Sequence, residues 1–252
     1  MESSTPDPGP RVIDRFDATE AAALAAARAA VLDRIERACR RVGRDPSTVT
    51  LVAVSKTVPV VRLRAAVAAG LTLFGENRVQ EGAEKAAQLA AATWHLVGPL
   101  QSNKARRAVE TFAAIETLDG PDLAARLDRI AGELRPGIPL PVLVQVNVDD
   151  DPGKAGFAPA ALPAVLPLLL AHPNLAVGGL MTVGRLVDDP AMARPTFMGL
   201  RRLSEDLRRT HERLGATLSM GMSDDFEVAV EEGATIVRIG RALFGARPTA
   251  GG

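Results

Sequence analysis

The sequence predicts a single closed (β/α)8 barrel, in which eight parallel strands are each followed by a helix. Short apolar runs alternate with segments of helical spacing along most of the chain, and this alternation implies parallel strand pairing. The apolar runs number eight, and one long helical segment precedes them. No G-x-G-x-x-G motif follows the first run, which disfavours the alternative of an open, doubly wound sheet.

The N-terminal region divides into a tail and a helix. Residues 1–17 are rich in Pro, Ser and Asp and are expected to form a flexible tail, so the barrel domain spans residues 18–252. The alanine-rich stretch that follows has a 3.6-residue apolar period and predicts a helix ending near Gly43. We expect this helix to fill the place that the eighth barrel helix would otherwise take.

The predicted elements follow in order. The strands are residues 49–55, 71–74, 94–97, 114–118, 141–148, 175–181, 217–220 and 235–239. The helical segments between them include residues 58–69, 79–92, 102–113, 121–134, 159–171 and 191–214. The strand runs are almost continuously Val, Leu and Ile, as is typical of strands covered on both faces.

Composition narrows the class of protein. The 252 residues are 47% hydrophobic and carry 30 acidic and 30 basic side chains, so a large core is expected and a nucleic-acid partner is not. No apolar stretch is long enough to span a membrane and no secretion signal is visible, so a cytoplasmic location is expected. The single cysteine, Cys39, lies in a helical pattern and is interpreted as structural, without a disulfide or a metal cluster.

Lys56 is an unusual residue to find at the end of an apolar strand. The run "LVAVSKTVP" ends on this lysine, and only four of the 30 basic residues are lysines. Unlike arginine, a partly desolvated lysine is neutral for part of the time and can form an imine with an aldehyde. The alternative is a surface lysine whose stem lies along the strand end. Imine chemistry itself leaves two classes open, class I aldolases and pyridoxal phosphate (PLP) proteins.

Two later stretches suit a phosphate group. "LSMGMSDD" places Ser219 and Ser223 around Gly221 after the seventh strand, and "RIGRALFG" places Gly240 and Arg241 after the eighth. Loops after strands 7 and 8 are the usual phosphate sites of barrels. The stretch from Ser223 can equally be an ordinary helix N-cap with acidic residues in the first turn.

Several motifs together resemble one family. "LVAVSKT", "FGENRVQE", "WHLVGPLQSNK", "GLMTVG", "LSMGMSDDFEVAVEEGATIVRIG" and "LFGAR" occur in the order seen in the YggS/PROSC family of pyridoxal phosphate homeostasis proteins, over about residues 49 to 247. The resemblance implies an alanine-racemase-like barrel of PLP fold type III that holds PLP as a lysine imine. It also implies a role in balancing the cellular supply of vitamin B6, with no established catalytic turnover.

The resemblance also implies a set of cofactor-binding residues. Lys56 would carry PLP, Asn77 would lie near its ring, Met181 would line the pocket, Arg238 would face the pyridine nitrogen, and Ser219, Gly240 and Arg241 would bind the phosphate. The chain departs from the family at two positions. Arg241 stands where members commonly have Thr or Ser, and Arg78 stands where they often have Tyr.

Binding without turnover is the expected activity. Electron withdrawal by PLP is helped by a carboxylate that keeps the pyridine nitrogen protonated, and Arg238 would do the opposite. A two-base racemase of this barrel type would resemble alanine racemase and need a tyrosine, which the chain lacks. In a chain of 252 residues, we also expect no room for the additional β-domain that such racemases carry. We therefore expect a monomeric PLP carrier or regulator that serves apo-enzymes. A PLP-dependent racemase and a class I aldolase are the alternatives.

Other polar residues support weaker predictions. His95 is expected to be a hydrogen-bonded histidine in the core or at the lower rim of the barrel. The acidic run at 149–151 is interpreted as a solvated loop and not a metal site. Lys104 and Lys154 are expected at the cofactor face, where they contact phosphate or solvent, or offer a second amine through which PLP is passed.

Overall fold

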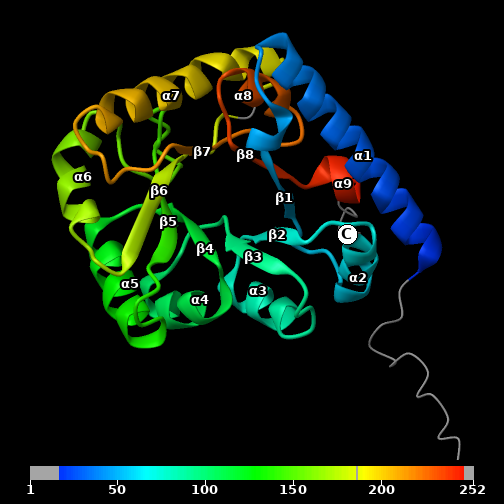
Figure 1. Ribbon diagram of the computed structural model, residues 1–252, viewed down its shortest axis with the longest axis horizontal. Helices are drawn as coiled ribbons and strands as arrows, with labels where there is room; N and C mark the ends of the chain where they lie inside the picture. Colours follow the sequence, from blue (N-terminus) through cyan, green and yellow to red (C-terminus); the bar gives the residue numbers. More distant parts are fainter. Residues whose placement is uncertain (1–16, 186, 247–252) are drawn as a thin grey trace, which may run out of the picture.

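The computed structural model describes residues 17–185 and 187–246. Its strands pair in parallel, in chain order, and β1 pairs with β8 to close the barrel, as the sequence predicts (Figure 1). The strands are β1 (Thr50–Val54), β2 (Leu73–Glu76), β3 (Thr93–Leu96), β4 (Ala114–Leu118), β5 (Leu140–Gln145), β6 (Leu175–Met181), β7 (Thr217–Ser219) and β8 (Ile236–Ile239).

Helices form an outer layer around the strands. They are α1 (Ala18–Arg41), α2 (Val60–Ala68), α3 (Val79–Ala86), α4 (Ala105–Thr111), α5 (Pro121–Leu134), α6 (Leu162–Leu170), α7 (Arg194–Arg208), α8 (Phe226–Glu231) and α9 (Arg241–Phe244). Short 3₁₀ turns lie at Pro46–Thr48, Ser102–Lys104 and Pro190–Ala193. None of the helices in the described ranges is long and apolar enough to cross a membrane.

Helix α1 takes the place predicted for it. Asp17 caps its first turn by accepting hydrogen bonds from the backbone N–H groups of Thr19 and Glu20. One face of the helix buries Leu24, Val31 and Ile35, and the helix packs against α2, α8 and α9 (Figure 1). Cys39 lies on the same buried face, as predicted, and burial raises the pKa of its thiol. The other residues of the predicted tail, 1–16, lie outside the described ranges.

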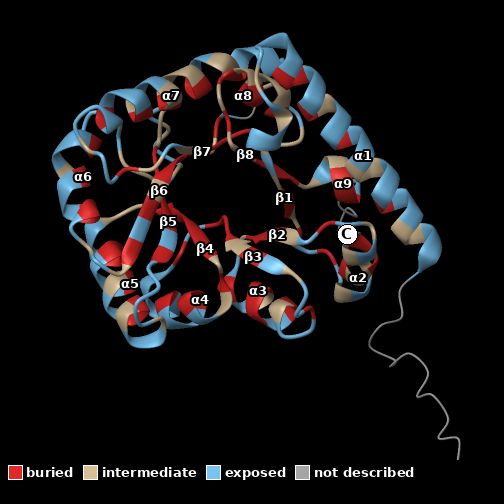
Figure 2. Ribbon diagram, in the orientation of Figure 1, coloured by how far each residue is buried: buried red, intermediate tan, exposed pale blue. Residues whose placement is uncertain are grey.

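Alternate residues of each strand point outward to the helices or inward to the centre of the barrel. One set of alternate residues packs under the helices in a large hydrophobic cluster, in which the rings of Phe74 and Trp94 stack with centroids 5.2 Å apart. Figure 2 shows the strands mostly buried and the exposed residues mainly on the outer faces of the helices and in the connecting loops. The other set points into the barrel, where a Cβ on Gly75 would touch Val52 at 2.8 Å.

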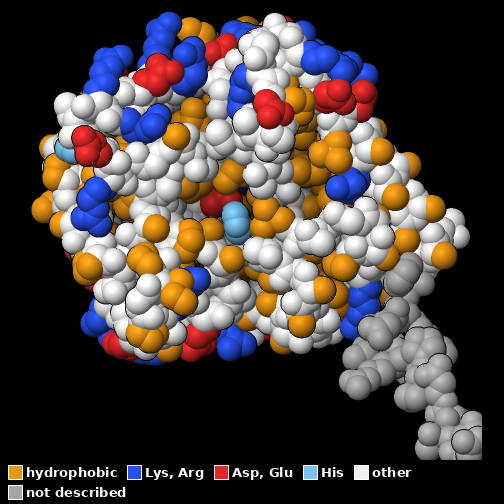
Figure 3. Space-filling model, viewed as in Figure 1, with side chains coloured by type: hydrophobic (Ala, Val, Ile, Leu, Met, Phe, Trp, Pro, Cys, Tyr) orange, Lys and Arg blue, Asp and Glu red, His pale blue; other side chains and the backbone are white. Residues whose placement is uncertain are grey.

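The inward-facing residues include an unusual number of polar side chains: His95, Glu116, Gln145, Ser219 and Arg238. The strands run clockwise from β1 to β8 in Figure 1, so right-handed crossovers place the N-terminal ends of the strands toward the viewer. Figure 3 shows this face, with a histidine beside an acidic side chain in its central hollow. The loops after the strands lie on the opposite face.

The strand limits differ from the prediction by two residues or more at β2, which spans Leu73–Glu76 and not residues 71–74, and at β5, which ends at Gln145 and not at residue 148. In β2, Leu71 is buried before the strand begins, and Glu76 extends the strand because Ser55 and Lys85 both donate hydrogen bonds to its Oε1. The sequence also suggested longer helices: α3 ends at Ala86, and a 3₁₀ turn at Pro190–Ala193 precedes α7.

Candidate functional site

The C-terminal ends of β1 and β8 border a pocket of about 350 Å³. Lys56, Gly240 and Arg241 all line it, which brings together three residues predicted from distant parts of the sequence. The other lining residues are Val54, Thr57, Val58, Pro59, Arg62, Phe244, Gly245 and Ala246. Lys56 lies two residues beyond the end of β1 and is half-buried. Because strand side chains alternate between the two faces, Lys56 points into the barrel as Val52 and Val54 do.

Arg238 projects from β8 into the barrel. Its side chain is buried, Nη1 donates to Ser219 Oγ at 2.6 Å, and Nη2 donates to the carbonyl oxygen of Thr182 at 2.7 Å. Burial lowers the pKa of Arg238, and the negative charges of Glu116 and Asp225 oppose this shift. An arginine with a lowered pKa is still a cation at neutral pH, so the barrel interior holds a fixed positive charge.

Hydrogen bonds link Arg238 to the lower part of the barrel. Ser219 Oγ donates to Glu116 Oε2 at 2.5 Å, and the other oxygen of Glu116 lies 2.7 Å from His95 Nδ1. The prediction of a hydrogen-bonded His95 is confirmed. Sequence reasoning missed Glu116. The available signal was an acidic residue inside the apolar run "AIETL", where a charge is costly unless it is paired.

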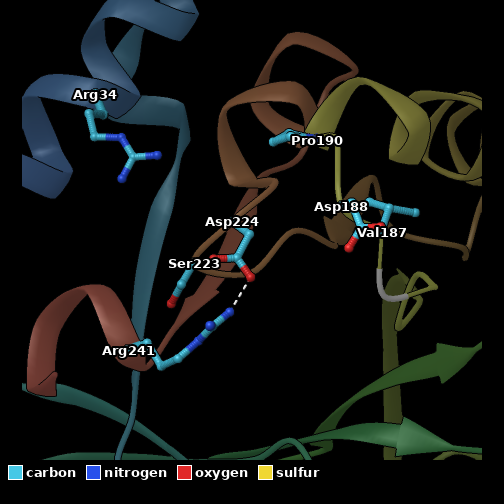
Figure 4. A pocket seen from close by; sticks show the side chains of 7 residues that line it. All are labelled: Arg34, Val187, Asp188, Pro190, Ser223, Asp224 and Arg241. Carbon is cyan, nitrogen blue, oxygen red and sulfur yellow. Dashed lines mark hydrogen bonds and ion pairs between the residues drawn. The ribbon is translucent and has the colours of Figure 1, made fainter. Parts of the chain in front are cut away.

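The two serines around Gly221 face different surroundings. Ser219 lies inside the barrel, between Glu116 and Arg238. Ser223 accepts a 3.3 Å hydrogen bond from the backbone N–H of Ala242 and lines a second pocket of about 580 Å³ (Figure 4). Gly221 separates them with φ +89°, a conformation that glycine adopts without strain.

Arg241 lies between the two pockets and lines both of them. Its guanidinium forms an ion pair with Asp224, drawn as a dashed line in Figure 4. Arg34 on α1 and Pro190 line the far walls of the larger pocket. The side chain that departs from the family pattern therefore occupies the wall between the two pockets, where its charge can act on either.

The loop after β7 does not form the side-chain N-cap considered in the sequence analysis. Asp225 occupies the N-cap position of α8 but makes no capping hydrogen bond to the helix. Instead, Asp225 Oδ1 accepts the backbone N–H of Met222 at 2.6 Å. Burial raises the pKa of Asp225, against the opposing effects of the Met222 hydrogen bond and the charge of Arg238.

Asn77 and Met181 lie at the C-terminal ends of two strands, Met181 as the last residue of β6 and Asn77 just beyond β2. Met181 is buried at the end of β6, and its Cα is paired with Ser219 on β7. Asn77 follows β2 by one residue, and the register pair Val54 with Gly75 places it level with Lys56. A Cβ at Gly98 would lie 2.4 Å from the carbonyl oxygen of Asn77, so the loop after β3 closely approaches this residue.

Lys104 and Lys154 lie outside both pockets. Lys104 is exposed in the 3₁₀ turn before α4, and Lys154 Nζ lies 3.5 Å from Asp151 Oδ2 in the loop after β5. Their role in passing PLP stays a prediction. Asp149 accepts hydrogen bonds from the hydroxyl of Thr196 and the backbone N–H of Arg185. Within the described ranges, no group of three or more His, Cys, Asp or Glu residues is arranged to hold a metal ion.

The fold and the site define a barrel of the alanine racemase class. The family model for the alanine racemase N-terminal domain matches residues 28–248. Alanine racemase of Clostridium difficile is 14% identical, with a TM-score of 0.66 over 87% of this chain and 60% of that chain. This likeness shows the fold alone.

Two nearer relatives identify the family. The pyridoxal phosphate homeostasis protein of Pseudomonas aeruginosa is 48% identical over 224 residues, which cover 87% of this chain and 94% of the relative. The structure of PipY from Synechococcus elongatus with PLP bound is 44% identical, with a TM-score of 0.74 over 84% of this chain and all of that chain. The chain belongs to the family of pyridoxal phosphate homeostasis proteins.

Proposed function

We propose that this protein binds PLP covalently at Lys56 and acts as a carrier or regulator in PLP homeostasis, without strong catalytic turnover. The observation that carries the proposal is that Lys56 shares one pocket with Gly240 and Arg241. An amine and a glycine- and arginine-containing loop are the two features that an aldehyde bearing a phosphate requires. The PLP bound to PipY, in a relative that is 44% identical, supports the same assignment.

The residues of the site fit the two ends of the cofactor. When bound, PLP supplies an aldehyde that condenses with a lysine amine and releases water. Lys56 provides the amine, and the guanidinium of Arg241 and the backbone at Gly240 provide the phosphate contacts. Ser223 adds a hydroxyl beside Arg241, while Ser219 holds Arg238 from within the barrel. In this proposal Asn77, which is level with Lys56, and Met181, at the end of β6, contact the cofactor between these two ends, although neither lines the pocket of Lys56 itself.

Arg238 accounts for the expected lack of turnover. A guanidinium has only hydrogen-bond donors, so it cannot accept a hydrogen bond from a protonated pyridine nitrogen. It therefore cannot keep that nitrogen protonated. Ser219 and Thr182 hold it in this orientation, and burial prevents water from replacing it. The chain also lacks any tyrosine to serve as a second base. These features favour storage of the cofactor over racemisation.

The experiment that tests the proposal uses the purified full-length protein. Addition of PLP should produce an absorbance band in the visible range, and borohydride reduction should fix PLP on the peptide that contains Lys56. Lys56→Ala should abolish both signals, whereas Lys104→Ala should retain them. Retention of both signals in Lys56→Ala would overturn the assignment.

Two outcomes would favour the alternative classes. Steady racemisation of alanine by the PLP-loaded protein, abolished by Lys56→Ala, would indicate a racemase. A protein that stays colourless with PLP and is trapped by borohydride only with a keto substrate would indicate a class I aldolase. We expect neither result.

A further inference from the structure

A buried cation, Lys85 on α3, lies directly behind the turn that carries Lys56. Its Nζ donates to the carbonyl oxygen of Ser55 at 2.7 Å, to Glu76 Oε1 at 2.6 Å and to Glu81 Oε1 at 2.7 Å. An ammonium group has three N–H donors, so these three oxygens satisfy it completely. The side chain of Lys85 is only 7% exposed, and among the four lysines, all of which lie in the described ranges, it is the one that is buried.

The two carboxylates of this cluster also hold the turn. Ser55 Oγ donates to Glu76 Oε1 at 2.7 Å, and the backbone N–H of Thr57 donates to Glu81 Oε1, also at 2.7 Å. Both neighbours of Lys56 in the chain are therefore bonded to the same cluster. A cluster that only fastened α3 to the barrel would not need bonds to the main chain on either side of Lys56.

Thr57 shows what these bonds maintain. Its φ is +66°, in the left-handed region, which is a rare and strained conformation for a β-branched residue. Such strain persists only where the surroundings fix it, and it occurs preferentially at functional sites. The hydrogen bond from the Thr57 N–H to Glu81 lies at this strained residue, immediately after Lys56.

The three oxygens that converge on Nζ suit the ammonium group of a lysine and not the guanidinium of an arginine. A compact ammonium can donate to three converging oxygens, whereas a planar guanidinium donates in a fixed fork. The chain uses arginine at most of its basic positions and retains lysine here. Burial raises the pKa of Glu76, against hydrogen bonds from Lys85 and Ser55. Lys85 is therefore the cation that limits the effect of burial on this carboxylate.

We propose that Lys85, through Glu76 and Glu81, is a positioning residue that holds the Ser55–Thr57 turn in its left-handed conformation and so directs Lys56 into its pocket. The geometry of the turn stands independently of any ligand, while its consequence for PLP rests on the proposed function. Lys85 itself makes no contact with the cofactor in this assignment.

The first measurement needs no PLP. Hydrogen exchange in the apo-protein should be faster by about tenfold or more in the peptide containing residues 55–58 of Lys85→Met than in the wild type. PLP affinity should weaken by about tenfold in the same variant, because the amine is presented in its bound geometry for a smaller fraction of the time. Arg202→Met, which removes an exposed basic side chain on α7 that lines neither pocket, should alter neither value.

A second substitution separates positioning from a general packing defect. Glycine adopts a positive φ without strain, so Thr57→Gly in the Lys85→Met background should restore PLP affinity to within about threefold of the wild type. A loss caused by damaged packing around α3 would not respond to a change at residue 57. Absence of this rescue would overturn the proposal, as would unchanged exchange and affinity in folded Lys85→Met.

If Lys85→Met does not fold, a less disruptive substitution at Glu81 provides the same test. Glu81 is partly exposed, so Glu81→Ala removes the Thr57 contact at lower cost to the core. Glu81→Ala should reproduce the faster exchange and weaker PLP affinity, and Glu81→Ala with Thr57→Gly should reverse the loss of affinity. If the wild type itself binds no PLP, the proposed function fails, and the exchange measurement alone decides the positioning role.

Discussion

Arg238 and Ser219 lie on neighbouring strands, and the guanidinium of one donates a 2.6 Å hydrogen bond to the hydroxyl of the other inside the barrel. The hydroxyl in turn donates to Glu116, so the serine bridges a buried cation and a buried carboxylate. This arrangement fixes both charges without direct contact between them. Its energetic importance can be measured.

The first prediction concerns this bridged pair. Arg238→Met leaves Glu116 buried without its cation, and the free energy of unfolding should fall by about 3–5 kcal/mol. Glu116→Gln in the same background should recover part of the loss, giving a coupling energy of about 1–3 kcal/mol in a double-mutant cycle. Urea unfolding of the four proteins provides the measurement. Strictly additive losses would show that Glu116 and Arg238 act independently.

The second prediction separates the two serines of the loop after β7. Ser223 lies beside Arg241, so Ser223→Ala should weaken PLP binding by about tenfold while leaving pyridoxal, which lacks the phosphate, nearly unaffected. Ser219→Ala should weaken both ligands alike, because it frees Arg238 and not a phosphate contact. Equilibrium titration with each ligand measures the ratio. The reverse pattern would return the phosphate contact to Ser219.

The third prediction concerns pH and Asp225. Burial raises its pKa above the ordinary value of 3.8, so the folded state holds this proton more tightly than the unfolded state. The contribution of Asp225 to stability therefore falls as the pH rises from its unfolded pKa through its folded one. Asp225→Asn removes this loss, and the stability of the variant relative to the wild type should increase as the pH rises from the ordinary value of 3.8 through the raised pKa of the folded state.

Urea unfolding at a series of pH values measures this trend. Asp122→Asn, at an exposed position in the first turn of α5, is the control for loss of a surface carboxylate. A difference between Asp225→Asn and wild type that shrinks as the pH rises would contradict the prediction.

The fourth prediction concerns Gly221. An alanine here would need φ +89°, and its Cβ would lie 2.5 Å from the Cβ of Ala229. Gly221→Ala should therefore lower the free energy of unfolding by about 2–5 kcal/mol. Gly120→Ala is the matched control, since a Cβ there meets nothing within 4 Å, and its effect should stay within about 0.5 kcal/mol. Similar thermal midpoints for the two variants would contradict this account.

Periodicity predicted the architecture because it reports burial directly. The strands at 114–118 and 175–181 and the helix at 121–134 have the predicted limits, since apolar runs and turn residues coincide there. Strand β2 was misplaced because its last residue is a glutamate. A charge inside a strand is acceptable only with a partner, and that partner, Lys85, lies nine residues further along the chain.

The sequence predicted those residues of the candidate site that directly follow a strand. Lys56, Gly240 and Arg241 come together because β1 pairs with β8, which the barrel topology implies. The positioning groups were not predictable. Glu116 reaches Ser219 and His95 across the barrel, and Glu81 reaches the backbone N–H of Thr57 from α3, contacts that sequence spacing does not indicate. Only the i,i+4 spacing of Glu81 and Lys85 on α3 was a signal in the sequence. The different directions of Ser219 and Ser223 likewise depend on the conformation at Gly221.

Closure of the barrel between its first and last strands also sets an order of events. The wall that carries Lys56 follows β1, whereas Gly240 and Arg241 follow β8 and are synthesised only after strands β2 to β7. The pocket cannot exist before β8 docks beside β1, so a nascent or truncated chain has no place for the ligand. A ligand can therefore bind only after the barrel has closed, and its binding stabilises the pairing of β1 with β8.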